Sequence, residues 1–237
     1  TEVPCISRVQ QAIDVGSNAR PIAIKGRQYV KQTLMAGYAR AAAILARDQD
    51  VFLMHTRLRF KDEMALYRRL GQVPQIWRSV PAVRLAVNDS RRQWVVDGED
   101  QSEFETCARA LIPHQIPTIY LEGYQRLLEQ TRELPWPKEP KLIWTSMAFS
   151  ADDVFKAWAG DKVEKGSRLV IAQHGGHYGM GRCSFPEDHE IGISDCYLTW
   201  GWDDKEQPQV KPVGQLKAWR PLGVMHEQTR ALLVTVA

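Results

Sequence analysis

The chain has 237 residues, of which 44% are hydrophobic and 25% charged. This composition is ordinary for a globular protein, and the length suits one large domain or two small ones. The net charge of +3 is too small to indicate nucleic-acid binding, so we expect no nucleic-acid partner. Charge interrupts every apolar stretch well before the roughly 18 residues that a membrane span requires, and no signal peptide is recognisable.

The cysteines and histidines are spaced in a way that argues against a metal site. Cys5, Cys107, Cys183 and Cys196 lie far apart and form no Cys-x-x-Cys pair. No His-x-x-x-His pair is present either. We therefore expect no bound metal and four reduced thiols, as in a cytoplasmic protein.

The first half of the chain is expected to be rich in helices, because its apolar residues recur mostly at helical spacing. Gly71 stands where a helix would end. The predicted elements of this half are helices at 28–47, 61–70 and 119–133, a buried strand at 50–56, and two weak strands at 75–77 and 94–96, the second within a polar loop at 91–105.

A proline-rich segment follows this half. Pro135, Pro137 and Pro140 stand within six residues, which is typical of a stiff connector. It predicts a division between a helix-rich N-terminal α/β part, residues 1–140, and a second part, residues 141–237.

The second part has the pattern of a parallel sheet. Strands are expected at 141–146, 169–173, 196–200 and 210–216, with helices between them that begin near Asp152 and Ser184. Strand, helix and strand within about thirty residues form a βαβ unit. The predicted class is therefore α/β, with a Rossmann-like parallel sheet flanked by helices. A last apolar run at 232–236 is expected to be the first strand of a further lobe that this chain lacks.

The most informative segment is a glycine-rich loop at 175–181, directly after the predicted strand that ends at Gln173 and His174. Glycines allow positive φ angles and a close approach to a ligand, and ligands of open α/β sheets bind at the carboxyl ends of strands. The loop is neither a Walker A motif nor a dinucleotide-binding Gly-x-Gly-x-x-Gly motif. The pattern predicts a site, although a glycine-rich turn with incidental histidines remains the alternative.

Two histidines of this loop, His174 and His177, are the candidate catalytic residues. A histidine at a strand end suits a general base because its pKa lies near neutral pH. The alternative for His174 is a hydrogen bond that only orients the backbone. Arg57, with Arg59 and Lys61, either meets a phosphate or an anionic glycan, or forms a solvated basic loop.

Further polar residues near the strand ends complete the predicted site. We expect Thr145, His174, Gly201 and Gly214 to lie at one edge of the sheet, since parallel strands end together. The acidic run at 187–190 suits a base or ligand set, or else the solvated first turn of a helix. The predicted substrate-binding residues are Ser146, Gln173, Gly175, Gly176, Tyr178, Gly179, Glu187, Asp188, His189, Glu190, Trp202 and Gly214.

An ordered series of motifs, from about residue 50 to residue 217, resembles a family of bacterial surface-carbohydrate transferases associated with O-antigen gene clusters. The individual motifs are short, and their order along the chain is the specific feature. The motifs lie at 60–77, 149–158, 164–166, 173–179, 187–190, 194–195, 199–202 and 211–214.

The resemblance implies one lobe of a GT-B-like glycosyltransferase in lipopolysaccharide biosynthesis. Such an enzyme takes a nucleotide-sugar donor and a glycan or lipid-linked glycan acceptor, and it has no bound cofactor. The implied location is the cytoplasm, with peripheral contact at the cytoplasmic face of the inner membrane. A glycerophosphate-type polyol-phosphate transferase and a non-catalytic carbohydrate-binding module are the alternatives.

Overall fold

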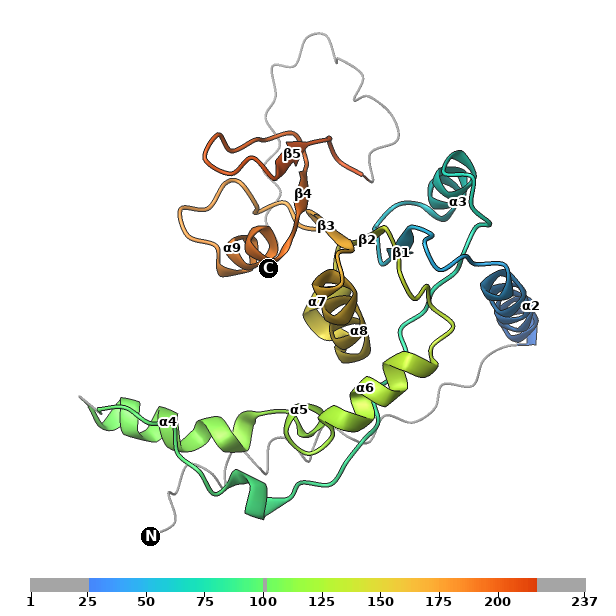
Figure 1. The fold of residues 1–237 in the computed structure, drawn as a ribbon. Helices are drawn as coiled ribbons and strands as arrows, with labels where there is room; N and C mark the ends of the chain where they lie inside the picture. The colour runs from blue at the N-terminus through green and yellow to red at the C-terminus, as the bar shows by residue number, and fades with distance from the viewer. Residues whose placement is uncertain (1–25, 100–101, 217–237) are drawn as a thin grey trace.

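The protein is an α/β fold built on one five-stranded sheet, as a computed structural model covering residues 26–99 and 102–216 shows (Figure 1). All neighbouring strands are parallel and follow chain order, which confirms the predicted fold class. The strands are β1 (Phe52–Met54), β2 (Leu142–Thr145), β3 (Arg168–Ala172), β4 (Cys196–Thr199) and β5 (Val210–Pro212).

Helices flank the sheet and connect its strands. Asp152 caps α8 by accepting a hydrogen bond from the Phe155 backbone N–H, and Ser184 caps α9 through the Glu187 N–H. Both helix starts were predicted at these residues. The helical elements are α2 (Gly26–Ile44), α3 (Phe60–Arg69), the 3₁₀ helix η2 (Asp89–Arg92), α4 (Glu103–Gln115), α5 (Thr118–Leu121), α6 (Tyr124–Glu133), α7 (Ala148–Ala151), α8 (Asp153–Glu164) and α9 (Phe185–Ile193).

The two faces of the sheet bury different clusters, because alternate residues of a strand point to opposite sides. One face, which includes Ile143 and Ile171, belongs to the main core together with residues of α6, α8 and α9. On the other face, Leu53 packs with Met64 and Tyr67 of α3. The sheet therefore lies between helices on both sides.

The sheet and the main core include residues from both sides of the proline-rich connector. Phe52 of β1 is aligned with Ile143 of β2 in a parallel ladder. The Phe52 ring lies 4.4 Å from the Trp158 ring and 5.0 Å from the Trp136 ring, measured between centroids. The division at residue 140 stays a prediction, and the one sheet spans it.

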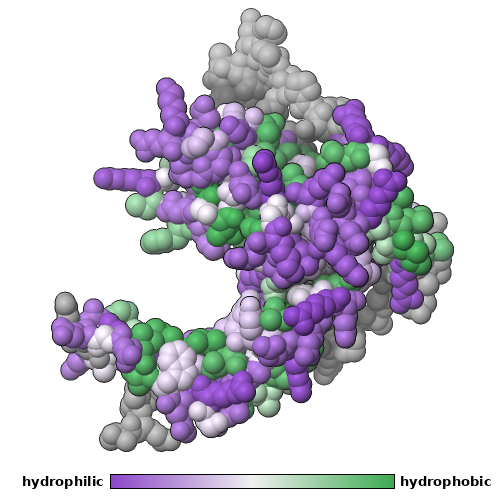
Figure 2. Space-filling model, in the orientation of Figure 1, coloured by the Kyte–Doolittle hydropathy of each residue, from purple (hydrophilic) through white to green (hydrophobic). Residues whose placement is uncertain are grey.

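An arm formed by residues 89–121 extends away from the sheet (Figure 1). Arg92 holds it together by an ion pair with Glu122 at 2.8 Å, with the two side chains 3% and 7% exposed. The same guanidinium donates to the backbone carbonyls of Pro113 and Ile116. Figure 2 shows an open hollow between this arm and the body of the molecule.

Several local predictions are wrong. Residues 75–77 and 94–96 form no strand, and the expected loop at 91–105 leads into α4. The helix predicted at 119–133 is two helices that meet at Gly123, where a Cβ atom would lie 2.0 Å from a methyl carbon of Leu85. The predicted strand at 232–236 lies outside the described residues.

Candidate functional site

The carboxyl ends of the strands form one edge of the sheet. Thr145 ends β2, and the parallel registers place His174, Gly201 and Gly214 just beyond the ends of β3, β4 and β5. The prediction that these four residues share one edge is confirmed. This edge is where open α/β sheets bind ligands.

Gln173 fixes the start of the glycine-rich loop. Its side chain is buried, and its Oε1 accepts hydrogen bonds from the Trp200 backbone N–H and from Trp202 Nε1, both at 2.9 Å. Its Nε2 donates to the Gly175 carbonyl at 2.7 Å. Gln173 thus ties the segment after β4 to the loop after β3, and it holds the backbone from which His174 projects.

Two glycines of the loop at 175–181 meet specific steric demands. Gly179 has φ +73°, and a Cβ atom there would lie 2.7 Å from the Trp202 ring. A Cβ atom on Gly175 would lie 3.1 Å from the His177 ring. Gly176 and Gly181 have neither a positive φ nor a neighbour within 3.4 Å of a built Cβ atom, so the conformational freedom of glycine is required at only part of the loop.

A buried carboxylate lies behind the loop. Glu190 is 1% exposed, and its two oxygens accept hydrogen bonds from the hydroxyls of Tyr178 at 2.7 Å and Tyr197 at 2.9 Å. His174 Nδ1 lies 3.6 Å from Glu190 Oε1, and His174 Nε2 lies 3.3 Å from the Tyr178 hydroxyl. One histidine, one carboxylate and two phenols therefore form a single polar cluster.

Burial sets the protonation of this cluster. Desolvation is the main cause that lowers the pKa of His174, and the charges of Arg57 and His177 lower it further. Burial also raises the pKa values of Glu190, Tyr178 and Tyr197, and hydrogen bonds from the two phenols oppose that rise at Glu190. At neutral pH His174 is accordingly uncharged, and both tyrosines remain hydrogen-bond donors.

This cluster opens into a cavity of about 560 Å³ between α7, α8 and α9, which we call the histidine cavity. Five of the predicted site residues meet there. The side chains from α7 and α8 lie in the motif at 149–158 but were not among the predicted site residues, since only tertiary packing brings them to the loop. The lining residues are Phe149, Ser150, Lys156, His174, His177, Tyr178, Pro186, His189 and Glu190.

The other predicted binding residues lie outside the histidine cavity. Ser146 is buried and donates to the carbonyl of Thr56 at 3.1 Å. Glu187 accepts the Gly179 backbone N–H at 2.5 Å and so tethers the loop to α9. Asp188 is exposed, Gly176 lies in the loop, and Gly214 follows β5 with φ +85°. Substrate contact by these residues stays a prediction.

A second cavity, of about 690 Å³, lies on the other side of α7. We call it the Arg57 cavity. It shares Ser150 with the histidine cavity, and His55 in it was not among the residues that the sequence pointed to. Its lining residues are His55, Arg57, Ser79, Val80, Pro81, Ala82, Met147, Ala148, Ser150, Ala151, Asp152 and Asp153.

No group of three or more histidine, cysteine, aspartate or glutamate side chains within 26–99 and 102–216 is arranged to hold a metal ion. In the same residues no helix combines the length and the apolarity needed to cross a bilayer.

Comparison with known proteins identifies the family. The model of the LIC12162 family transferases matches residues 7–237, which is nearly the whole chain. No curated protein and no solved structure matches this chain. A transferase assignment agrees with a neutral histidine and a buried carboxylate at the ligand-binding edge of a parallel sheet. The chain belongs to the LIC12162 family of transferases.

Proposed function

We propose that this transferase is a glycosyltransferase of bacterial surface-polysaccharide biosynthesis. In this proposal it moves a sugar from a nucleotide-sugar donor to a glycan or lipid-linked glycan acceptor in the cytoplasm, at the inner membrane. The observation that supports it most is the pairing of His174 with buried Glu190 inside the histidine cavity. The family assignment supports a transferase, and the resemblance of the ordered motifs to O-antigen transferases favours glycosyl transfer.

The chemistry requires one proton acceptor. An acceptor hydroxyl attacks the anomeric carbon of the donor, the bond from that carbon to the phosphate oxygen breaks, and the hydroxyl proton moves to His174. The leaving nucleotide keeps the electron pair of the broken bond. A neutral imidazole suits this role, because a positioned general base must be unprotonated before it can act.

Glu190 determines which ring nitrogen of His174 accepts the proton. Nδ1 is buried, makes no hydrogen bond and lies 3.6 Å from the Glu190 carboxylate, whose negative charge favours a proton on Nδ1. We assign that tautomer from the geometry. In this proposal the acceptor hydroxyl displaces the Tyr178 hydroxyl, which lies 3.3 Å from Nε2, and Nε2 then receives the acceptor proton. The carboxylate stabilises the imidazolium that forms. His177 and His189, both exposed on the rim of the cavity, are placed to contact the acceptor.

The decisive experiment replaces His174 in the full-length protein and measures transfer with a panel of nucleotide sugars. We expect His174→Ala and His174→Gln to lower kcat by roughly 10²- to 10⁴-fold, the usual effect of losing a general base. His114→Gln is the matched control, because His114 is exposed on α4 in the arm. Circular dichroism and thermal unfolding verify that each variant is folded.

Three results would contradict the proposal. Folded His174→Ala with near-normal kcat would remove His174 as the base. Turnover of a nucleotide-activated polyol, with no reaction of any nucleotide sugar, would identify a polyol-phosphate transferase. Glycan binding that survives His174→Ala, without transfer under any condition, would identify a binding module.

A further inference from the structure

The Arg57 cavity has two residues in an unfavourable backbone conformation. His55 has φ +52° and Arg57 has φ +62°, in the left-handed region that residues other than glycine rarely adopt. Such residues cluster at binding and active sites, where the surrounding structure maintains the strain. Here the strained segment directly follows β1, at the carboxyl edge of the sheet, and both residues line the cavity.

The guanidinium of Arg57 has no anionic partner among the residues that the structure describes. Its Nη2 contacts the Met147 thioether, which is a weak acceptor. By contrast, Arg59 lies two residues further along the same loop and pairs with Asp62 at 2.6 Å. Arg57 therefore brings an uncompensated positive charge and most of its hydrogen-bond donors to the cavity.

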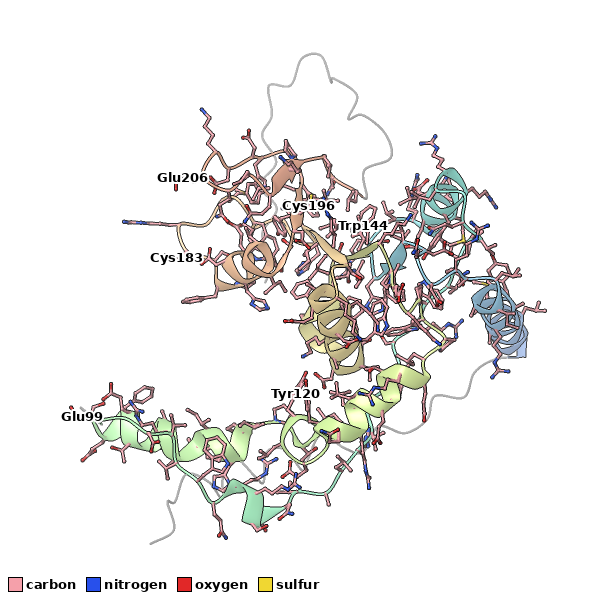
Figure 3. The ribbon with its side chains drawn as sticks, in the orientation of Figure 1. Glu99, Tyr120, Trp144, Cys183, Cys196 and Glu206 are labelled. Atoms are coloured by element: carbon pink, nitrogen blue, oxygen red, sulfur yellow. The ribbon has the colours of Figure 1, made fainter. Side chains whose placement is uncertain are left out.

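Two acidic residues, Asp152 and Asp153, also line this cavity. Asp152 Oδ1 accepts the Phe155 backbone N–H at 2.9 Å as the N-cap of α8, whereas Asp152 Oδ2 is buried without a hydrogen-bond partner among the described residues. Asp153 pairs with Lys156 at 2.8 Å and accepts a hydrogen bond from Tyr120 at 2.7 Å. Figure 3 shows Tyr120 reaching from α5 towards α8. The N-terminus of α8 and Lys156 thus offset part of the negative charge of these two residues.

Two further donors lie beside Arg57. His55 Nε2 is 3.4 Å from the Ser79 hydroxyl, and both side chains line the same cavity. A guanidinium, an imidazole and a hydroxyl can each donate hydrogen bonds to a phosphate, and the charge-assisted, bidentate bonds of arginine are among the strongest. The cavity has ample room for a phosphoryl group and part of the molecule to which it is attached.

We propose that the Arg57 cavity binds the phosphoryl group of a phosphorylated substrate, with Arg57 as its charged ligand and His55 and Ser79 as additional donors. The identity of the phosphorylated substrate rests on the proposed function, whereas phosphate binding itself is argued from the residues of the cavity. A nucleotide-sugar donor and a lipid-linked acceptor both contain a diphosphate. The two cavities share Ser150, so a diphosphate at Arg57 would be bound in the cavity that adjoins the one lined by His174.

The test measures binding of inorganic pyrophosphate to the full-length protein by isothermal titration calorimetry. We expect Arg57→Gln to weaken the affinity by about 10- to 100-fold, the usual loss for hydrogen bonds to a charged group. Arg57→Lys keeps the charge without the planar fork and is expected to fall between Arg57→Gln and the natural protein. Arg59→Gln is the matched control and is expected to bind normally.

Competition identifies the source of the phosphate. If uridine diphosphate displaces pyrophosphate from the natural protein and binds the Arg57→Gln variant more weakly, the cavity binds the nucleotide-sugar donor. Geranyl diphosphate behaving in this way would assign it to a lipid-linked acceptor. Either outcome supports the proposal.

Two results would overturn the proposal. The first is a folded Arg57→Gln variant that binds pyrophosphate with normal affinity. The second is an equal loss of affinity in Arg57→Gln and Arg59→Gln, which would reveal only a diffuse charge effect. If Arg57→Gln unfolds, Arg57→Gly provides the same test, because glycine accepts φ +62°. His174→Ala separates the two proposals, since it is expected to stop transfer while leaving pyrophosphate affinity unchanged.

Discussion

The environment of His174 contains two opposing influences at the scale of single residues. A carboxylate 3.6 Å from Nδ1 favours the charged imidazolium, whereas burial and the nearby cation of Arg57 favour the neutral ring. The lowered pKa shows that burial and the cation prevail before substrate binds. The same carboxylate becomes useful only once the ring takes up a proton, which is the requirement for stabilising a transition state.

The pH dependence of transfer follows from this balance. Because the pKa of His174 lies below its usual value, the ring stays neutral down to slightly acidic pH. We therefore expect kcat/KM to be high at neutral pH and to fall on the acid side, with an inflection below about 6.5. Arg57→Gln removes a positive charge, so it should move that inflection upwards. A pH–rate profile that is unchanged in Arg57→Gln would show that Arg57 does not influence His174.

The backbone strain at Arg57 can be tested by measuring the free energy of unfolding. We expect Arg57→Gly to leave the free energy of unfolding unchanged or to raise it by up to about 1 kcal/mol. The left-handed conformation costs other residues roughly 1–2 kcal/mol, and the entropy of glycine offsets part of the relief. Arg68→Gly, in helix α3, should instead cost about 1 kcal/mol. Urea unfolding measures both, and equal destabilisation by the two changes would show that Arg57 is not strained.

The arm illustrates how one buried ion pair organises several short elements. Arg92 lies in η2 and binds carbonyls near the end of α4, while Glu122 follows α5. Pro113 is the buried residue of α4, so packing against the body contributes little to this helix. The charged pair therefore takes the place of a hydrophobic face in fixing the arm.

As the pH falls, local opening of the arm should increase before the sheet opens. The hydrogen bonds from Arg92 lower the pKa of Glu122 to about 2. A lowered folded-state pKa stabilises the protein above the unfolded-state value, and this stabilisation is lost as the pH falls towards 2. We expect hydrogen exchange in 103–122 to accelerate between pH 5 and about 2 relative to the sheet. Glu122→Gln should already exchange fast at pH 5, and slow exchange there would contradict this role of the pair.

The elements that the sequence predicted well are those buried in the sheet. The apolar runs of β2, β3 and β4 are continuous because a parallel sheet is covered on both faces, and the caps at Asp152 and Ser184 are local signals. Helix α4 escaped prediction because it has no face against the core to impose an apolar period. Ile76 and Trp77 gave an apolar signal, but Trp77 packs against the core without a strand partner.

The candidate site was predictable only where it is local in the sequence. His174, Tyr178 and Glu190 lie within a short segment after β3, so the loop and its helix indicated them together. Lys156 and His55 reach the edge of the sheet through tertiary packing, for which a single sequence holds no signal. The positive φ of Arg57 is equally invisible, because nothing in the residue type marks it.

At the scale of the whole molecule, the five parallel strands bring two distant parts of the chain to one edge. The histidine cavity is built by residues after 148, whereas the Arg57 cavity combines residues of 55–82 with α7 and the start of α8. The two cavities can act on one substrate only if β1 keeps its register against β2. The integrity of that pairing is therefore a requirement for function as well as for stability.

Phe52 is the residue that tests this coupling. Its ring is fully buried and contacts Trp77, Trp136, Phe155 and Trp158, which come from both sides of the proline-rich connector. We expect Phe52→Ala to lower the free energy of unfolding by about 3–5 kcal/mol, the usual cost of removing a buried aromatic ring. Val83→Ala, at an exposed position, is the control.

The shape of the unfolding transition tells whether the two parts are separate units. If residues 1–140 and 141–237 share one core, Phe52→Ala should shift a single transition, seen alike by tryptophan fluorescence and by far-ultraviolet circular dichroism. Two transitions, of which Phe52→Ala moves only one, would mean that the parts unfold independently. In that case the edge of β2 would have to be stable without β1, although Ile143 and Trp144 are each paired with a β1 residue in the folded sheet.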